Sequence, residues 1–175
     1  MPQLRSFAPV PDLVEATPAG EAARKRLGEE IVKSTSRELL SDGIALGYRY
    51  DGSPIVCPDG SEPPPLSVTE YVQTTFPGAR APHVRLADGR STLDLFGRAY
   101  VMLRFARDAP DVTPFKTAAK RRSVPLEVAA IEEPAVCSAY EKKLVLVRPD
   151  GHVAWRGDAL PADAAAVIAR VTGAG

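Results

Sequence analysis

The sequence predicts an α/β domain with a mixed sheet flanked by helices, preceded by an amphipathic helix and a proline-rich meander. Two observations favour this class. From residue 83 onward, apolar strand segments alternate with helix signals and end in a hairpin followed by a last helix. The 175 residues, 45% hydrophobic and 25% charged, also have the composition of a globular protein long enough to bury a core. We expect three segments, residues 1–46, 47–82 and 83–175.

The first segment is expected to be an irregular lead followed by an amphipathic helix. Thr17-Pro18 supplies a helix cap and then proline at the first helical position. The helix is predicted to end near Leu40, with Gly43 close behind as a stop. Its apolar stripe recurs every four positions and consists of Ala23, Leu27, Ile31, Thr35 and Leu39. Either the rest of the chain or a second copy of it must cover this stripe.

The second segment is expected to be an ordered meander. Its high proline content excludes helix interiors and central strands. Its aromatic residues favour an ordered path over a disordered linker, because such linkers are poor in aromatics. These aromatics are Tyr48, Tyr50, Tyr71 and Phe76.

The third segment contains the predicted sheet. Val84 and Leu86 alternate with polar neighbours as in a strand, before a turn at Asp88-Gly89. The later elements are a strand over 99–105, a helix from Thr113 to about Arg122, a strand over 125–131, a short irregular or helical piece around Cys137, hairpin strands over 143–148 and 152–156, and a helix that Pro161 opens and Gly173 closes. The helical crossover makes the first two core strands parallel, and the tight turn makes the last two antiparallel. This order is the thioredoxin-like arrangement.

The cysteines argue against redox activity in this fold. Redox chemistry needs a thiolate at the start of the helix after the first core strand, where the helix dipole lowers the thiol pKa. The connection over 106–122 contains no cysteine, and residues 140–143 stand where redox members carry a proline. Cys57 and Cys137 form no C-x-x-C pair, and a disulfide between them is disfavoured in a reducing compartment. We therefore expect a redox-silent domain.

Charge and hydropathy exclude two classes of partner. Lysine plus arginine equals aspartate plus glutamate at 22 each, so no overall field attracts nucleic acid or an anionic membrane. No apolar run approaches the roughly 20 residues that span a bilayer. The first five residues have no apolar core of the signal-peptide type. We expect a cytoplasmic protein that binds neither nucleic acid nor membranes.

Three stretches together resemble the C-terminal part of single-component flavin-dependent aromatic hydroxylases, of the phenol hydroxylase and polyketide hydroxylase type. They are "LGYRYDGSPIV" (46–56), "PGARAPHVRLADGRSTLDLFGR" (77–98) and "LVLVRPDGHVAWRG" (144–157). The resemblance runs from about Ala19 to the end of the chain. It implies a thioredoxin-like domain that follows a large FAD-binding and substrate domain, braces it and helps subunits associate. The first helix would then be the helix that links the two parts.

The catalytic part of that family is absent from this sequence. A dinucleotide fold needs G-x-G-x-x-G between a strand and a helix, and the early glycines Gly20, Gly28 and Gly43 do not supply it. No catalytic, FAD-binding or metal residue is therefore assigned to this chain, and FAD is expected only through a separate or missing domain. The chain is a stand-alone relative or a piece of a longer enzyme, and the leading methionine favours the former.

Four residues of the second stretch form a candidate polar cluster: Arg80, His83, Asp94 and Arg98. The two arginines either clamp a carboxylate or phosphate, or form internal salt bridges that fix the meander to the sheet, and we favour the salt bridges. His83 has no second histidine or cysteine at metal-ligand spacing, so we expect a structural histidine bonded to a backbone or carboxylate partner. Asp94 is expected to cap or turn the chain ahead of Gly97. His152, at the start of the second hairpin strand, is expected at the surface.

Three functional hypotheses follow. The first is a non-enzymatic association module that dimerises, or docks on a flavin hydroxylase chain, through the helix stripe and the meander. The second is a fragment or complementing subunit of an aromatic monooxygenase that depends on FAD and NAD(P)H. The third is a binder of a small anion or aromatic ligand at Arg80, His83 and Arg98, which would raise the apparent stability of the chain.

Overall fold

The computed structural model describes residues 11–174, with the backbone but not the side chains of residues 36–39. The chain divides into two compact units, one up to Ser41 and one from Asp42 onward, and each is described by itself. The second unit thus contains both the meander and the predicted sheet. The first ten residues, which include most of the predicted irregular lead, lie outside the described part.

The first unit contains one long helix, α1 (Pro18–Leu39). The Thr17 hydroxyl accepts a hydrogen bond from the Gly20 backbone at 3.2 Å, as expected for a cap followed by proline. Of the predicted stripe, Ala23 is buried, Leu27 and Thr35 are partly exposed, and Ile31 is 43% exposed. The side chain of Leu39 lies outside the described residues. The stripe is therefore partly exposed to solvent over much of its described length.

The second unit is built on a four-stranded mixed sheet in the order β2-β1-β3-β4. The strands are β1 (Tyr100–Phe105), β2 (Leu126–Ile131), β3 (Leu144–Val147) and β4 (Val153–Gly157). β1 pairs with β2 in parallel and with β3 antiparallel, and β3 pairs with β4 antiparallel. This topology confirms the fold class that the sequence predicts.

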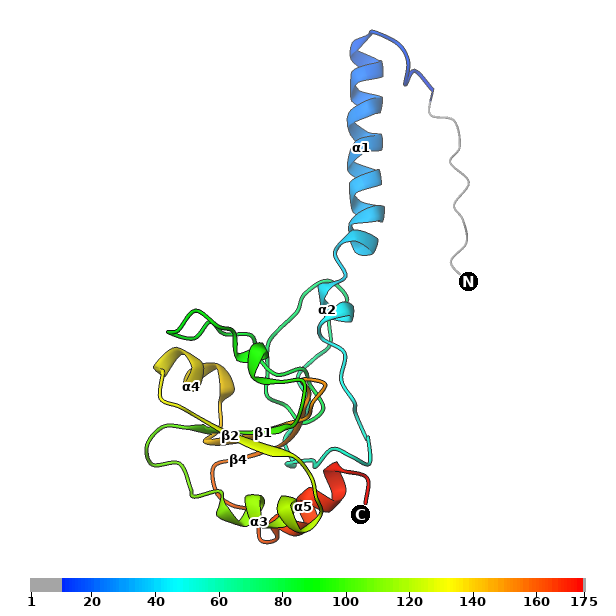
Figure 1. The fold of residues 1–175 in the computed structure, drawn as a ribbon. Helices are drawn as coiled ribbons and strands as arrows, with labels where there is room; N and C mark the ends of the chain where they lie inside the picture. Colours follow the sequence, from blue (N-terminus) through cyan, green and yellow to red (C-terminus); the bar gives the residue numbers. More distant parts are fainter. Residues whose placement is uncertain (1–10, 175) are drawn as a thin grey trace. The chain divides into compact units, whose positions relative to one another are not determined.

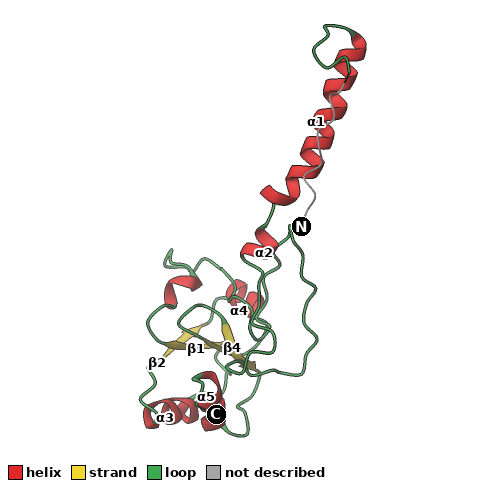
Figure 2. Ribbon diagram, turned by 90° about the vertical axis from the view of Figure 1, so that its right-hand side faces the viewer, coloured by secondary structure: helices red, strands yellow, loops and turns green. Residues whose placement is uncertain are grey.

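Helices cover both faces of the sheet (Figures 1 and 2). α3 (Thr113–Arg121) and α5 (Ala164–Val171) lie together on one face, and α4 (Pro134–Tyr140) lies on the other. Alternation along the central strands feeds two separate cores. Met102 and Leu146 join the core under α3 and α5, while Leu103 and Val145 join the core under α4.

Of the helices α3 and α5, one begins as predicted and one a few residues later. α3 begins at Thr113, as predicted, and the Asp111 carboxylate accepts from the Thr113 backbone at 3.2 Å. α5 begins after Asp163, whose side chain accepts from two backbone N–H groups of the first turn, and not at Pro161. Gly43 lies inside the short helix α2 (Asp42–Ala45) and does not stop α1. A Cβ on Gly43 would collide with the Ser67 carbonyl, so close backbone approach explains this glycine.

The meander extends the sheet beyond β4. Val153 exchanges backbone hydrogen bonds with Gly78 and Ala79, both at 2.8 Å, and the Tyr50 backbone donates to Gly78 at 3.1 Å. An isolated bridge also pairs Arg80 with His152. Gly78 adopts φ +92°, and a Cβ there would lie 3.1 Å from the Tyr50 carbonyl oxygen. The free edge of β4 is therefore paired within the chain, as exposed sheet edges require.

The stretch over 83–98 forms a small turn structure and not the predicted strand. Arg85 and Ser91 make an isolated bridge, and the turn between them closes at Gly89, where φ is +87°. A short 3-10 helix, η1 (Thr92–Leu95), follows. Too few paired residues stand on either side of the turn to form a strand.

Candidate functional site

The four residues of the predicted polar cluster are not bonded to one another in the described part of the chain. Asp94 accepts from the Ser91 backbone at 2.7 Å and completes a capping box at the start of η1, which is the local role expected for it. The backbone of His83 donates to the Gln73 side chain, and its imidazole is exposed. Arg98 is exposed as well. Within residues 11–174, no hydrogen bond or ion pair joins any two of the four.

Two other arginines hold the meander in place. The salt bridges expected of Arg80 and Arg98 are not among those that the described residues form. Arg49 instead pairs with Asp51 at 3.1 Å and donates to the Pro64 carbonyl at 2.7 Å. Arg156 also ties the meander to the sheet. Arg156 thus performs the expected role of fixing the meander to the sheet, while Arg49 joins two parts of the meander to each other.

Arg156 is the centre of a buried polar network that we call the Arg156 node. Its side chain, 8% exposed, projects from β4 and donates to Asp59 at 2.7 Å and to Glu141 at 2.8 Å. It also donates to the hydroxyls of Ser61 and Thr75, both at 3.0 Å. Burial alone would raise the pKa of Asp59, but hydrogen bonds from Ser61 and Arg156 outweigh it and lower that pKa. Asp59 is therefore ionised at neutral pH, and the node joins the meander, β4 and the end of α4.

A second cluster forms where the three resembling stretches meet, and we call it the tyrosine patch: Tyr48, Tyr50, Arg148, Asp150 and His152. The rings of Tyr48 and Tyr50 contact the His152 ring with centroid distances of 5.1 and 4.8 Å. The Arg148 guanidinium lies over the Tyr50 ring at 5.0 Å and pairs with Asp150 at 2.7 Å. The two tyrosines are 46% and 37% exposed. The patch is thus an aromatic surface, formed by Tyr48 and Tyr50, over a polar base formed by Arg148, Asp150 and His152.

His152 is buried, at 3% exposure, which corrects the expectation of a surface histidine. Asp150 in the turn that precedes it is exposed, but the two tyrosines from a distant part of the chain cover the His152 ring. Burial lowers the pKa of His152, and Arg148 acts in the same direction, while the charge and hydrogen bonds of Asp150 oppose the shift. The neutral imidazole is therefore favoured in the folded chain.

We expect the stability of the chain to fall as pH drops below about 6.5, the ordinary histidine value. Because the folded-state pKa of His152 is lowered, the unfolded chain binds a proton first on acidification and is favoured by it. The loss should not exceed about 1.4 kcal/mol per pH unit for one such group. Urea unfolding at pH 7.5, 6.5 and 5.5 measures the free energy of unfolding at each pH. In the variant His152→Phe, this free energy should fall less as the pH drops. A decline of equal size in that variant would assign it to other groups.

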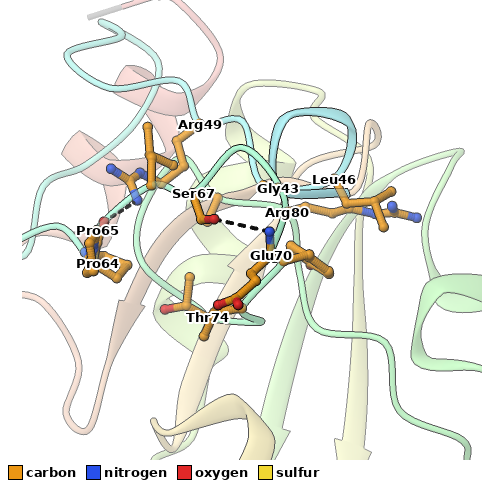
Figure 3. Close-up of a pocket in the computed structure, with 14 residues that line it drawn as sticks. Gly43, Leu46, Arg49, Pro64, Pro65, Ser67, Glu70, Thr74 and Arg80 are labelled. Atoms are coloured by element: carbon orange, nitrogen blue, oxygen red, sulfur yellow. Dashed lines mark hydrogen bonds between the residues drawn. The ribbon is translucent and has the colours of Figure 1, made fainter. Parts of the chain in front are cut away.

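A small pocket lies beside the meander, between α2 and the 64–74 stretch (Figure 3). Its volume is about 30 Å³, whereas pockets for drug-sized ligands usually measure about 300–1,000 Å³. Figure 3 shows Arg49 bonded to the Pro64 carbonyl and the Glu70 backbone bonded to the Ser67 hydroxyl. The Arg49 guanidinium and the Ser67 hydroxyl thus already serve the fold, and the pocket, which Arg80 also lines, has no room for an aromatic ring.

A wider hollow opens at the C-terminal end of α5. It measures about 350 Å³ and is bordered by Pro54, Ile55, Arg170 and Gly173. Arg170 is the one charged residue on its border, and its guanidinium already donates to the Val56 carbonyl at 2.9 Å. The hollow offers too few polar groups to orient a substrate.

The described part of the chain shows neither a glycine-rich dinucleotide turn after β1 nor a cluster of metal-ligating side chains. The turn between β1 and α3, where a dinucleotide fold carries its glycines, contains none in residues 106–112. Across residues 11–174, no group of three or more histidine, cysteine, aspartate or glutamate side chains is placed to hold a metal ion. Nor does this stretch contain a helix of the length and hydropathy that crossing a bilayer requires.

The two cysteines are free thiols on opposite faces of the sheet. Cys57 is buried in the core under α3 and α5, while Cys137 packs against the core under α4. Burial raises the pKa of Cys57, which disfavours the reactive thiolate, although Arg170 partly opposes this shift. Neither thiol stands at the start of α3, where redox chemistry in this fold would need one.

A family model described as "Aromatic-ring hydroxylase, C-terminal" matches residues 74–175. The chain belongs to this family. Among the relatives, the FAD-dependent monooxygenase apdD of Emericella nidulans is 35% identical over 146 residues, which cover 76% of this chain and 23% of the relative. The 4-methyl-5-nitrocatechol 5-monooxygenase of a Burkholderia species is 30% identical over 161 residues, which cover 82% of this chain and 29% of the relative.

Solved structures of flavin enzymes match the chain as well. The rebeccamycin biosynthetic enzyme RebC, with bound 7-carboxy-K252c, superposes with a TM-score of 0.86 and 40% identity over 98% of this chain and 32% of its own. The flavin-dependent monooxygenase PieE, in complex with FAD and substrate, gives 0.70 and 30% identity over 93% of this chain and 31% of its own. The chain thus spans between a quarter and a third of the length of most of these relatives. These matches confirm the resemblance that the three stretches indicate.

Proposed function

We propose that this chain is a redox-silent association domain of an FAD-dependent aromatic hydroxylase, acting in the cytoplasm. It binds and braces the part of the enzyme that holds flavin and substrate, and carries no catalytic group itself. One observation carries the proposal: the chain belongs to the C-terminal family of these hydroxylases and corresponds to only 23–32% of the compared monooxygenases. Self-association into a homodimer is compatible with this role.

The described residues support a bracing role in two ways. The buried charges of the Arg156 node are satisfied by one another and by hydroxyls, as in a structural network. The pocket of about 30 Å³ is too small for an aromatic substrate, so flavin and substrate would both lie in the partner.

A tagged pull-down from the native lysate, with mass spectrometry and a flavin absorbance scan of the eluate, tests the proposal. We expect a yellow eluate that contains a hydroxylase chain in near-equal amount to the bait. A colourless eluate with the bait alone would overturn it. As a control, the purified chain titrated with FAD should leave the flavin fluorescence unchanged, since the flavin site is assigned to the partner.

A further inference from the structure

The tyrosine patch has the composition of a protein-binding hot spot. Tyrosine and arginine are enriched at the few interface positions that carry most of the binding energy. Tyr48 and Tyr50 contact the His152 ring, and Arg148 lies over the Tyr50 ring, so these four side chains form one continuous surface.

Two buried polar atoms of the patch have no partner among the described residues, the Nη1 atom of Arg148 and the Nε2 atom of His152. The Nδ1 atom of His152 lies 3.3 Å from the Asp150 carbonyl oxygen, so we assign the ring proton to Nδ1. Nε2 is then an acceptor, while Nη1 of Arg148 is a donor. A buried polar atom without a partner costs free energy that a matching group would recover.

A residue in an extended segment presents its own N–H and C=O to the same side, so it can bond to one acceptor and one donor of a neighbouring surface. Tyr48 and Tyr50 cover these atoms, but both phenol rings are partly exposed, and exposed side chains change rotamer within nanoseconds. A rotation of either ring opens the base of the patch to a bound segment.

We propose that the tyrosine patch docks a backbone segment of the FAD-binding part of an aromatic hydroxylase, with a carbonyl on Arg148 and an N–H on His152. This inference rests on the proposed function. The matched region covers 98% of this chain, including the patch, and only 32% of the RebC chain. The remaining two-thirds of such a chain, which lies outside the matched region, is therefore the occupant we assign.

The test measures the affinity between the full chain and the flavoprotein purified from the pull-down. Three variants alter the patch: Tyr48→Ala removes an exposed ring, Arg148→Met removes the donor, and His152→Phe removes the acceptor but keeps a ring. The matched control is Val72→Ser, which alters a side chain 68% exposed elsewhere on the meander. We expect each patch variant to weaken binding about 10-fold or more, and the control to change it less than about 2-fold.

Circular dichroism confirms that each variant folds. As a second measurement, hydrogen exchange of the wild-type complex should slow at residues 48–50 and 148–152. If the wild-type chain binds the flavoprotein but neither the variants nor the exchange responds, the patch is not the docking site and the proposed function stands. If the wild-type chain binds no flavoprotein, both proposals are overturned.

Discussion

Replacement of Arg156 by methionine is expected to destabilise the chain by about 3 kcal/mol, the lower end of the range for removing one partner of a buried ion pair. Methionine retains most of the aliphatic length but removes every donor of the guanidinium. Asp59 then loses its charge partner, and Thr75 and Ser61 lose hydrogen bonds. We place the value at the lower end because Glu141, the second carboxylate, is 45% exposed and solvent can rehydrate it.

Urea unfolding followed by the fluorescence of Trp155, the one tryptophan of the chain, measures this loss. The matched control is Arg107→Met, which breaks an ion pair with Glu132 where the arginine side chain is 88% exposed. The control should cost less than about 1 kcal/mol, as exposed pairs do. Equal stability of the two variants would mean that the Arg156 node does not hold the meander.

A double-mutant cycle with Asp59→Asn isolates the pairwise contribution. If the ion pair carries much of the effect, the double variant should be more stable than the sum of the two single losses implies. Strict additivity would assign the loss to Thr75, Ser61 and Glu141.

The strands and helices of the sheet domain were predictable because their signals are local. Apolar runs such as "YVMLRF" mark the core strands, and Thr113-Pro114 and Pro149-Asp150-Gly151 mark a helix start and a turn within a few residues. A crossover helix and a tight turn then leave one pairing direction for each strand pair. The parallel β1–β2 pair and the antiparallel β3–β4 pair follow from these constraints, whereas the pairing of β1 with β3 is seen only in the structure.

The polar networks were not predictable, because they join residues far apart in the sequence. Arg156 and Asp59 are 97 positions apart, and nothing near either residue indicates the other. His152 follows an exposed turn, so local reasoning placed it at the surface. Its burial depends on Tyr48 and Tyr50, about a hundred positions earlier. The one available signal was that all these residues lie in or beside the three stretches that carry the family resemblance.

The arginines and acids of residues 77–98 first suggest chemistry, but the buried contacts of the stretch are those of a scaffold. The Pro82 carbonyl accepts hydrogen bonds from the hydroxyls of Thr92 at 2.7 Å and Tyr140 at 2.8 Å. The side chains of His83 and Arg98 are instead exposed to solvent. Tyr140 therefore fastens this stretch to α4, together with Glu133 at the start of α4, whose carboxylate accepts from the Ala87 backbone at 3.1 Å.

Two substitutions of Tyr140 separate its ring from its hydroxyl. Tyr140→Ala removes a fully buried ring that packs on Phe105 at 4.8 Å, and is expected to cost about 4 kcal/mol. Tyr140→Phe keeps the ring and is expected to cost about 1 kcal/mol, because the Pro82 carbonyl retains its bond from Thr92. Burial also raises the pKa of Tyr140, so the phenol stays protonated and donates throughout the neutral range.

Urea unfolding of both variants measures the two costs, and native-state hydrogen exchange locates them. In Tyr140→Phe, exchange should quicken over residues 82–92 while β1 and β3 keep their protection, because the lost bond fastens the stretch and not the sheet. If the two variants lost the same stability, the hydroxyl alone would hold α4 to the stretch and the ring would add nothing. If Tyr140→Phe left exchange over 82–92 unchanged, the hydrogen bond from Thr92 to the Pro82 carbonyl would be enough to hold the stretch. The turn at residues 85–91 would then be positioned by η1 and its capping box.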